Sequence, residues 1–284
     1  MTVGAEAQAP PDQALPNIET LLARVGERIA EYYKRAQNVI CTEKNTVQPV
    51  GHDYAPVGFA RVTEYELHVE SGLNADGEEL AEAKVVRELL RVNGRPPRDK
   101  DRNDRAGCTD ANPLSTEPLT FLLPIHRSEY TFVSGGAGKG RDRNTLIIEF
   151  TSSRPEGKGQ LEEDPRGHPD CFTWSLPVVL KGRVFVDATS FEVVRVEQRL
   201  ASMADLSVPI KLQREHNFGN SVVVERHDTV TRYRTVGFHD PDEAMLLPES
   251  IETLIVVRGG LESLRSRQVF ADYRRFMTGA RLIK

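Results

Sequence analysis

The chain changes its hydrophobic period once, and this change most constrains its fold. Residues 17–37, NIETLLARVGERIAEYYKRAQ, place apolar side chains at helical spacing after Asn17, a residue type that often caps helices. From residue 59 onward, apolar and polar residues alternate instead, as in FARVTEYELHVE (59–70). The gaps between such runs are too short for the helical crossovers that parallel strands need. We therefore expect one amphipathic helix followed by about ten antiparallel strands in meander order, a mainly β fold with an open sheet.

The run LKGRVFVDATSFEVVRVEQRLA (180–201) contains the clearest strand pair. GRVFVD predicts one strand and ATS supplies a turn. EVVRVEQRL predicts a second strand, in which Val194 and Val196 alternate with charged residues. KVVRELLRVNG (84–94) fits a short helix or a strand, and its closing Asn-Gly turn favours the strand.

Residues 133–142, VSGGAGKGRD, look like a phosphate-binding loop because four glycines surround Lys139. The Walker pattern needs a glycine where this stretch begins with valine, and a hydroxyl after the lysine, where the chain has Gly140. A phosphate loop also leads into a helix, whereas NTLIIEF (144–150) is short and strand-like. The stretch therefore predicts the connection between that strand and EYTFV (129–133).

No other motif carries recognisable chemistry. FHDPDEA (238–244) gathers acidic side chains but lacks the ligand series and the glycine of a calcium loop, so it predicts an acidic turn. The seven histidines have no metal-ligand spacing, and G-x-S-x-G does not occur. His227 and Asp228 are adjacent, so a strand directs them to opposite faces. We therefore expect no metal, no cofactor and no enzymatic activity.

Composition limits the partners. Of the 284 residues, 39% are hydrophobic and 28% are charged, which suits a globular protein with a sizeable core. The net charge is −5 and the 37 Lys and Arg residues are spread along the chain, so nucleic acid is not an expected partner. No apolar run approaches the ~20 residues of a membrane helix, so we do not expect a membrane-integral protein.

We expect a single domain over residues 17–284, interrupted by polar loops at 95–117 and 151–170. Residues 1–16, rich in Ala and Pro, predict either a disordered tail or the remnant of a signal peptide. Ala5-Glu6-Ala7 has the small-x-small pattern of a signal-peptidase site, although the preceding basic and apolar regions are missing from the sequence.

The three cysteines, Cys41, Cys108 and Cys171, lack the spacing of a zinc site. Cys108 lies in one polar loop and Cys171 directly follows another, whereas Cys41 lies between apolar residues. We predict a disulfide between Cys108 and Cys171 and a buried Cys41. Three free thiols in a cytosolic protein are the alternative.

The helix, the many strands and the hairpin GRVFVDATSFEVVRVEQRL together resemble the outer-membrane lipoprotein carrier superfamily. Hairpins like Val186-Asp187-Ala188-Thr189 followed by Val194-Arg195-Val196 are frequent there, and LLPESIETLI (246–255) resembles the closing hairpins of the family. The resemblance implies an open half-barrel around an apolar cavity. The chain is also similar to exported bacterial proteins of unknown role. It departs from the family in its polar loops, its cysteines and FADYRRFM (270–277).

Two functions follow as hypotheses. In the first, a periplasmic or secreted, non-enzymatic protein binds an acyl chain, a lipoprotein or a hydrophobic peptide on an apolar concave face. In the second, the sheet edge or the polar loops recognise another envelope protein, as in a sensor or interaction module. A filled core is the alternative interpretation of the candidate residues, and for any one of them it is the preferred one. The candidate residues of the concave face are Tyr65, Leu67, Val69, Leu146, Ile148, Phe150, Val194 and Val196.

Overall fold

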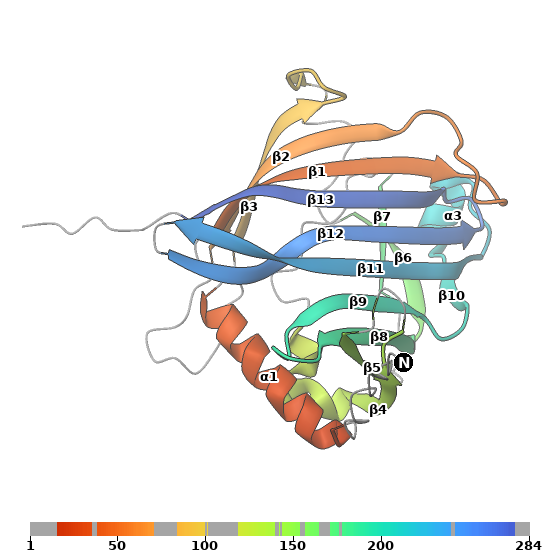
Figure 1. The fold of residues 1–284 in the computed structure, drawn as a ribbon. Coiled ribbons are helices and arrows are strands. Elements are labelled where there is room, and N and C mark those ends of the chain that lie inside the picture. Colours follow the sequence, from red (N-terminus) through yellow and green to blue (C-terminus); the bar gives the residue numbers. More distant parts are fainter. Residues whose placement is uncertain are drawn as a thin grey trace, which may run out of the picture.

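The computed structural model shows a helix followed by a large, mostly antiparallel sheet, as the sequence predicts (Figure 1). It describes residues 16–35, 39–70, 84–99, 101, 119–139, 142, 144–153, 157–164, 171–175, 178–239 and 242–275. The helical elements are α1 (Ile18–Arg35), η2 (Thr120–Leu122), η3 (Pro124–Glu129) and α3 (Ile210–His216). The strands are β1 (Val39–Val50), β2 (Arg61–Glu70), β3 (Lys84–Val92), β4 (Tyr130–Ala137), β5 (Thr145–Ser152), β6 (Gly159–Glu163), β7 (Phe172–Ser175), β8 (Leu180–Asp187), β9 (Val193–Leu200), β10 (Ala204–Ser207), β11 (Ser221–His239), β12 (Asp242–Arg258) and β13 (Ser263–Arg275).

The main strand path runs β3-β2-β1-β13-β12-β11-β9-β8-β5-β4, and β10, β6 and β7 branch from β11. The pairs are antiparallel apart from the short pair of β10 and β6, which is parallel. β1 pairs with β13, so the first and last strands meet inside the sheet, which departs from the meander order predicted. β3 and β4 end the path, so the sheet is not closed into a barrel within the described residues.

β1 is a twelve-residue strand that the sequence pattern did not predict. Its buried positions alternate, as in any half-buried strand, but two of them are Glu43 and Asn45. Because these polar side chains stand where apolar residues are expected, the two-residue hydrophobic period is hidden. The strand is therefore recognisable only from its partners β2 and β13.

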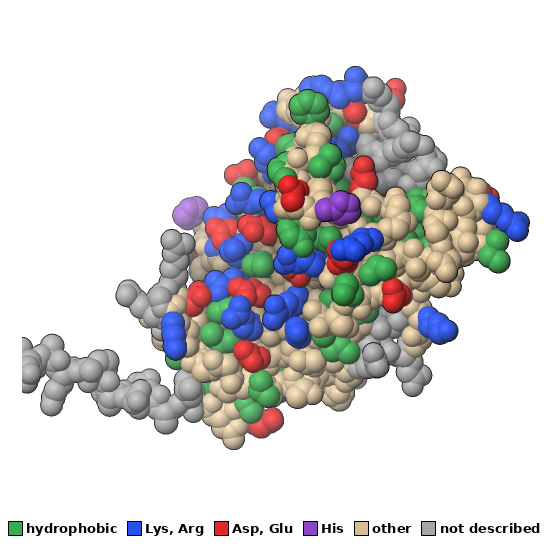
Figure 2. Space-filling model, turned by 90° about the vertical axis from the view of Figure 1, so that its right-hand side faces the viewer, with side chains coloured by type: hydrophobic (Ala, Val, Ile, Leu, Met, Phe, Trp, Pro, Cys, Tyr) green, Lys and Arg blue, Asp and Glu red, His purple; other side chains and the backbone are tan. Residues whose placement is uncertain are grey.

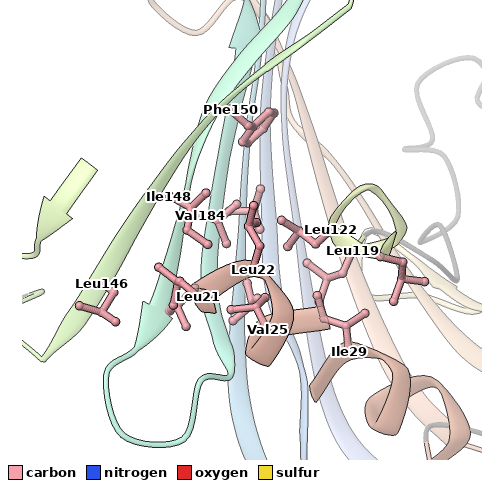
Figure 3. Packing of buried hydrophobic residues seen from close by; sticks show 14 of the residues in the cluster. Leu21, Leu22, Val25, Ile29, Leu119, Leu122, Leu146, Ile148, Phe150 and Val184 are labelled. Carbon is pink, nitrogen blue, oxygen red and sulfur yellow. The ribbon is translucent and has the colours of Figure 1, made fainter. Parts of the chain in front are cut away.

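α1 begins as predicted, because the Asn17 side chain oxygen accepts a hydrogen bond of 3.1 Å from the backbone N–H of Glu19. Its apolar stripe, Leu21, Leu22, Val25 and Ile29, is buried against the sheet. Figure 3 shows Leu21, Leu22 and Val25 on the side of α1 that faces Ile148 and Val184, with Ile29 beside Leu119. Among the described residues, no helix is long and apolar enough to cross a membrane.

The glycine-rich stretch 133–142 connects β4 and β5 as a hairpin, as predicted, and not as a phosphate loop. The backbone N–H of Gly138 donates to the carbonyl of Thr145 at 2.8 Å, which closes the turn. Gly136 has φ +84°, a left-handed conformation that glycine adopts without strain. Lys139 is exposed, whereas Gly140 and Arg141 lie outside the described residues.

The region predicted as a polar loop at 151–170 instead contains β6, and the segment before β11 contains the unpredicted helix α3. β6, β10 and α3 bury a second apolar core with β11, in which Leu161, Leu206 and Leu212 are central. The predicted tail, 1–16, and the loop at 95–117 fall largely outside the described residues. Figure 2 shows acidic and basic side chains interspersed on one face of the molecule.

Candidate functional site on the inner face of the sheet

One row of cross-strand partners crosses the sheet and defines its inner face, the face on which α1 packs. Each member lies directly opposite the next on the neighbouring strand, so all the side chains point to the same face. From β5 to β3 the members are Ile148, Val184, Val196, Thr231, Ile251, Gln268, Asn45, Thr63 and Val92. All are buried except Ile251, which is half-buried. The row is apolar from β5 to β9 and largely polar from β11 to β2. We call the inner face of β4, β5, β8 and β9 the apolar half and that of β13, β1, β2 and β3 the polar half; β11 and β12 lie between them.

The apolar half consists of β4, β5, β8 and β9 beneath α1. The buried side chains of Ile148 and Val184 lie near Leu21 and Leu22 of α1 there (Figure 3), and Phe150 and Val196 belong to the same cluster. Phe121 of η2 packs against Phe150 with ring centroids 4.8 Å apart. Such a surface is stabilised mainly by the area it buries, at roughly 25 cal/mol per Å².

A pocket lies between the C-terminal half of α1 and the strands β9, β11 and β12. Its volume is about 60 Å³. Burial raises the pKa of the Tyr32 hydroxyl above its usual value. The pocket is lined by Ile29, Tyr32, Leu119, Val193, Tyr233, Met245 and Leu246, with Arg28, Glu31 and Glu192 also contributing.

Two arginines tie α1 to its surroundings by hydrogen bonds to backbone carbonyls. The Arg28 side chain donates to the carbonyl of Ser190, in the turn between β8 and β9, at 3.0 Å. Arg127 of η3 donates from Nε to the carbonyl of Leu122 at 2.9 Å and from its terminal nitrogen to the carbonyl of Leu22 in α1. These contacts fix the position of the helix, while its apolar stripe supplies the buried area.

The polar half consists of β13, β1, β2 and β3. At its centre the fully buried carboxylate of Glu43 accepts two hydrogen bonds from Arg87, at 2.6 and 2.8 Å, and a third from Gln268 at 2.9 Å. The Arg87 guanidinium also lies 3.9 Å from the centre of the Tyr65 ring. A buried ion pair is tolerated only when its remaining hydrogen-bonding groups are served, and this network serves them.

The residues predicted for the concave face are divided between the two halves. Leu146, Ile148, Phe150 and Val196 lie together in the apolar half, where α1 covers them. Tyr65 and Leu67 lie in the polar half, and Leu67 packs with Cys41 and Phe270. The backbone of Val69 pairs with Val39 of β1, while its side chain lies outside the described part of the structure.

The prediction that the Val194 side chain lies on the apolar inner face is wrong. A register shift between Phe185 and Val186 of β8 falls opposite β9, so that Val186 pairs with Val193. Val193 and Val196 enter the apolar core, and Val194 is only half-buried. An irregularity of this kind reverses the side-chain alternation locally and leaves no mark in the hydrophobic pattern.

Sequence reasoning also missed the polar half. Glu43, Asn45 and Gln268 carry no motif, and they converge only because β1 lies between β2 and β13. The one available signal is the alternation of Cys41, Glu43, Asn45 and Val47, which is a strand pattern once the polar members are counted as buried.

Other clusters of titratable side chains are explained by ion pairs. Ligand atoms of Glu163, Glu215 and His216 lie within 4.8 Å of one another, but the Lys211 ammonium already contacts Glu163 at 3.0 Å. The acidic stretch 238–244 connects β11 and β12, as predicted, and Glu243 pairs with Arg275 at 2.9 Å.

The cysteines occupy different environments. Cys41 is a free, buried thiol, and burial together with the nearby Glu43 charge raises its pKa to about 12. Cys171 is also buried but does not titrate as a free thiol. Cys108 lies outside the described residues, so the pairing of Cys108 with Cys171 stays a prediction.

Comparison with known proteins gives a likeness of fold. No family model matches the sequence, and no curated protein matches it. The chain is similar to a solved domain assigned to outer-membrane lipoprotein sorting in Vibrio parahaemolyticus, with a TM-score of 0.43 and 10% identity over 93% of this chain and 96% of that chain. It is also similar to a LolA superfamily protein from Nitrosomonas europaea, with a TM-score of 0.38 and 9% identity over 93% and 97% of the two chains. Function has to be argued from the inner face itself.

Proposed function

We propose that this protein is a non-enzymatic binding protein that holds the acyl chain of a lipid or lipoprotein, or a hydrophobic peptide, against the apolar half of its inner face. The observation that carries this proposal is the pocket between α1 and the strands β9, β11 and β12, lined by Ile29, Val193 and Leu246. Its walls continue into the main apolar core, because Ile29 and Val193 belong to both, while Arg28, Glu31 and Glu192 also contribute to its lining.

An acyl chain can replace α1 on this surface at a small net cost. The helix stripe and an acyl chain both bury apolar area against the same strands, with similar free energy per unit area. The pocket of about 60 Å³ is too small for a whole chain. We therefore propose that the ligand displaces the C-terminal part of α1, which contacts the turn between β8 and β9 through the hydrogen bond from Arg28 to the Ser190 carbonyl.

Ligand binding can be tested by native mass spectrometry of gently purified protein and by titration with an environment-sensitive apolar dye. Leu246→Trp should fill the pocket and weaken dye binding by about tenfold or more. Leu264→Trp is the matched control, since Leu264 is half-buried on the same face, opposite Ile255 and thus about 30 Å along the strand direction. A lipid-free protein that binds no dye, or equal loss in both variants, would contradict the proposal.

We further propose that the protein is periplasmic or secreted and carries the Cys108–Cys171 disulfide. The burial of Cys171 and its lack of a titrating thiol support this. Thiol labelling after denaturation without reductant should then modify Cys41 alone. Labelling of all three cysteines in protein isolated from its native compartment would contradict both statements.

A second candidate function, recognition of an envelope protein, is supported by the loop between β1 and β2. Phe59 is 97% exposed there, and Val57 is 54% exposed. The loop is fixed by hydrogen bonds from Val57 N–H to the Pro49 carbonyl at 2.9 Å and from the Gln48 amide to the Val57 carbonyl at 2.9 Å. Exposed apolar side chains on a fixed loop are typical of contact surfaces. If this function holds, Phe59→Ser should abolish capture of a protein partner and leave dye binding unchanged.

A further inference from the structure

The outer face of the sheet, opposite α1, carries a groove that the proposed function does not use. Successive residues of a strand point to opposite faces, so the outward side chains are the sequence neighbours of the inner row, such as Arg183 beside Val184. The groove has a volume of about 460 Å³ and lies over β4, β5, β8, β9 and β11. Gly182 belongs to its lining, and a Cβ there would lie only 2.0 Å from the Glu197 carbonyl oxygen. The groove shares no lining residue with the pocket at α1 and is large enough for a small ligand.

One cross-strand row of this groove consists of hydrogen-bond donors. Its members are Thr131, Thr151, Lys181 and Arg199, each directly opposite the next on the neighbouring strand. Neither Lys181 nor Arg199 forms an ion pair with a carboxylate of the described residues. Like charges that stand directly opposite each other destabilise a sheet. The row therefore holds two uncompensated positive charges, which an anion bound in the groove would stabilise.

The carboxylates that line the groove differ in their partners. Asp228 accepts a hydrogen bond of 3.0 Å from Arg226, and Glu197 pairs with Arg183 at 2.8 Å. Glu149 lies directly opposite Arg183, two residues along β5 from the donor row, which is about 7 Å. Glu149 is exposed and forms no ion pair with the cations that the structure describes. The groove thus presents two unpaired positive charges and, one row away, one unpaired negative charge.

An aminoalkyl phosphate matches this pattern of charges. A phosphate monoester carries about 1.5 to 2 negative charges at pH 7 and offers acceptor oxygens to guanidinium, ammonium and hydroxyl groups. A carboxylate carries only one negative charge and would compensate only one of the two cations. A phosphate without an amine would leave Glu149 unpaired, whereas an ammonium group two carbons from the phosphate provides the missing cation. The two ends of such a ligand therefore suit two neighbouring rows of the groove.

We propose that the outer groove binds an aminoalkyl phosphate, with Lys181 and Arg199 holding the phosphate and Glu149 holding the ammonium group. This chemistry occurs in a free ester, phosphoethanolamine, and in the headgroup of phosphatidylethanolamine, where the phosphate is a diester. The groove lies on the face opposite the pocket at α1, so this site is independent of the proposed function.

The test compares phosphoethanolamine with ethyl phosphate, which lacks only the amine, by titration calorimetry at low ionic strength. The wild-type protein should bind phosphoethanolamine roughly threefold more tightly, the value of one solvent-exposed ion pair. Glu149→Gln should bind the two probes equally. Arg199→Met should weaken the binding of both roughly tenfold, because it removes charge-assisted hydrogen bonds to the phosphate and keeps the apolar stem.

Arg265→Met is the matched control, since Arg265 is exposed on the same outer face and lies outside the groove; this variant should bind both probes like the wild-type protein. Sedimentation with phosphatidylcholine vesicles, with and without phosphatidylethanolamine, distinguishes the two sources. Binding that needs phosphatidylethanolamine and Arg199, without binding of the soluble probes, supports the headgroup. Failure of all these ligands to bind, equal affinity of the wild-type protein for both soluble probes, or an equal loss in Arg265→Met would overturn the inference. Dye binding at the pocket should stay unchanged in Arg199→Met, so each of these failures leaves the proposed function standing.

Discussion

The two halves of the inner face are both buried, but they are stabilised in different ways. The apolar half is stabilised mainly by buried apolar surface, because the α1 stripe covers Ile148, Val184 and their neighbours with few directional contacts. The polar half is held by directional bonds, because Glu43 depends on three specific hydrogen bonds from Arg87 and Gln268. Area-based contacts can be exchanged for those of a ligand, whereas a buried ion pair cannot be rearranged cheaply. The difference indicates that the apolar half can open to a ligand, whereas the polar half keeps its shape.

The largest effect should come from breaking the ion pair of the polar half. Arg87→Met leaves the fully buried carboxylate of Glu43 without its cation. We expect a loss of about 3–5 kcal/mol in the free energy of unfolding, measured by urea denaturation. The double variant Glu43→Leu with Arg87→Met should recover most of this loss. If Arg87→Met lowers the free energy of unfolding by no more than a surface substitution does, the polar half is not the more rigid half.

A smaller loss, with a different consequence, is expected in the apolar half. Leu22→Ala removes a buried side chain of the α1 stripe and should cost about 2–4 kcal/mol. Because it loosens the cover over the apolar half, it should also increase dye binding, which Arg87→Met should not do. Equal changes in dye binding for the two variants would remove the functional distinction between the halves.

Gly26 tests the polar tie between α1 and η3. A Cβ at this position would collide with the Arg127 guanidinium, which donates to the Leu22 carbonyl. Gly26→Ala should therefore cost about 1 kcal/mol, since the lost charge-assisted hydrogen bond outweighs the gain in helix propensity. In an Arg127→Ala background the same substitution should instead stabilise the protein by about 1 kcal/mol. Stabilisation in both backgrounds would show that the tie contributes nothing.

An effect of similar, small size concerns the turn that receives Arg28. The Asp187 carboxylate accepts hydrogen bonds from the backbone N–H groups of Thr189 and Ser190, at 2.9 and 2.8 Å, and these lower its pKa. A lowered pKa in the folded state gives stability that is present above the unfolded value of about 3.9 and lost as pH falls below it. Asp187→Ala should cost about 1 kcal/mol at pH 7 and flatten the acid limb of stability against pH. An acid limb as steep as that of the wild-type protein would contradict this assignment.

The same contrast explains what the sequence could predict. The apolar half follows from local pattern: the spacing of Leu21, Leu22 and Val25 predicts the helix, and the alternation of Leu146, Ile148 and Phe150 predicts β5. The polar half depends on pairing between distant segments, because Glu43 and Gln268 lie 225 residues apart in the chain. No local pattern records which strands become neighbours, so β1 was missed.

Within the apolar half, the sequence could not predict which of two neighbouring valines lies on the inner face. The register shift opposite β9 exchanges Val193 for Val194 on the inner face, and both are valines. Composition and period cannot tell them apart, since only the backbone geometry of the pair β8–β9 decides which one is buried.

Photo-crosslinking tests the central claim most directly. A dodecanoic acid carrying a diazirine near the end of its chain would be irradiated with the wild-type protein, and the labelled peptides identified by mass spectrometry. The account predicts labels on the pocket lining of α1, β9 and β12, around Ile29, Val193 and Leu246, that excess dodecanoic acid removes. Labels concentrated on the loop around Phe59, or labels that excess dodecanoic acid does not remove, would contradict it.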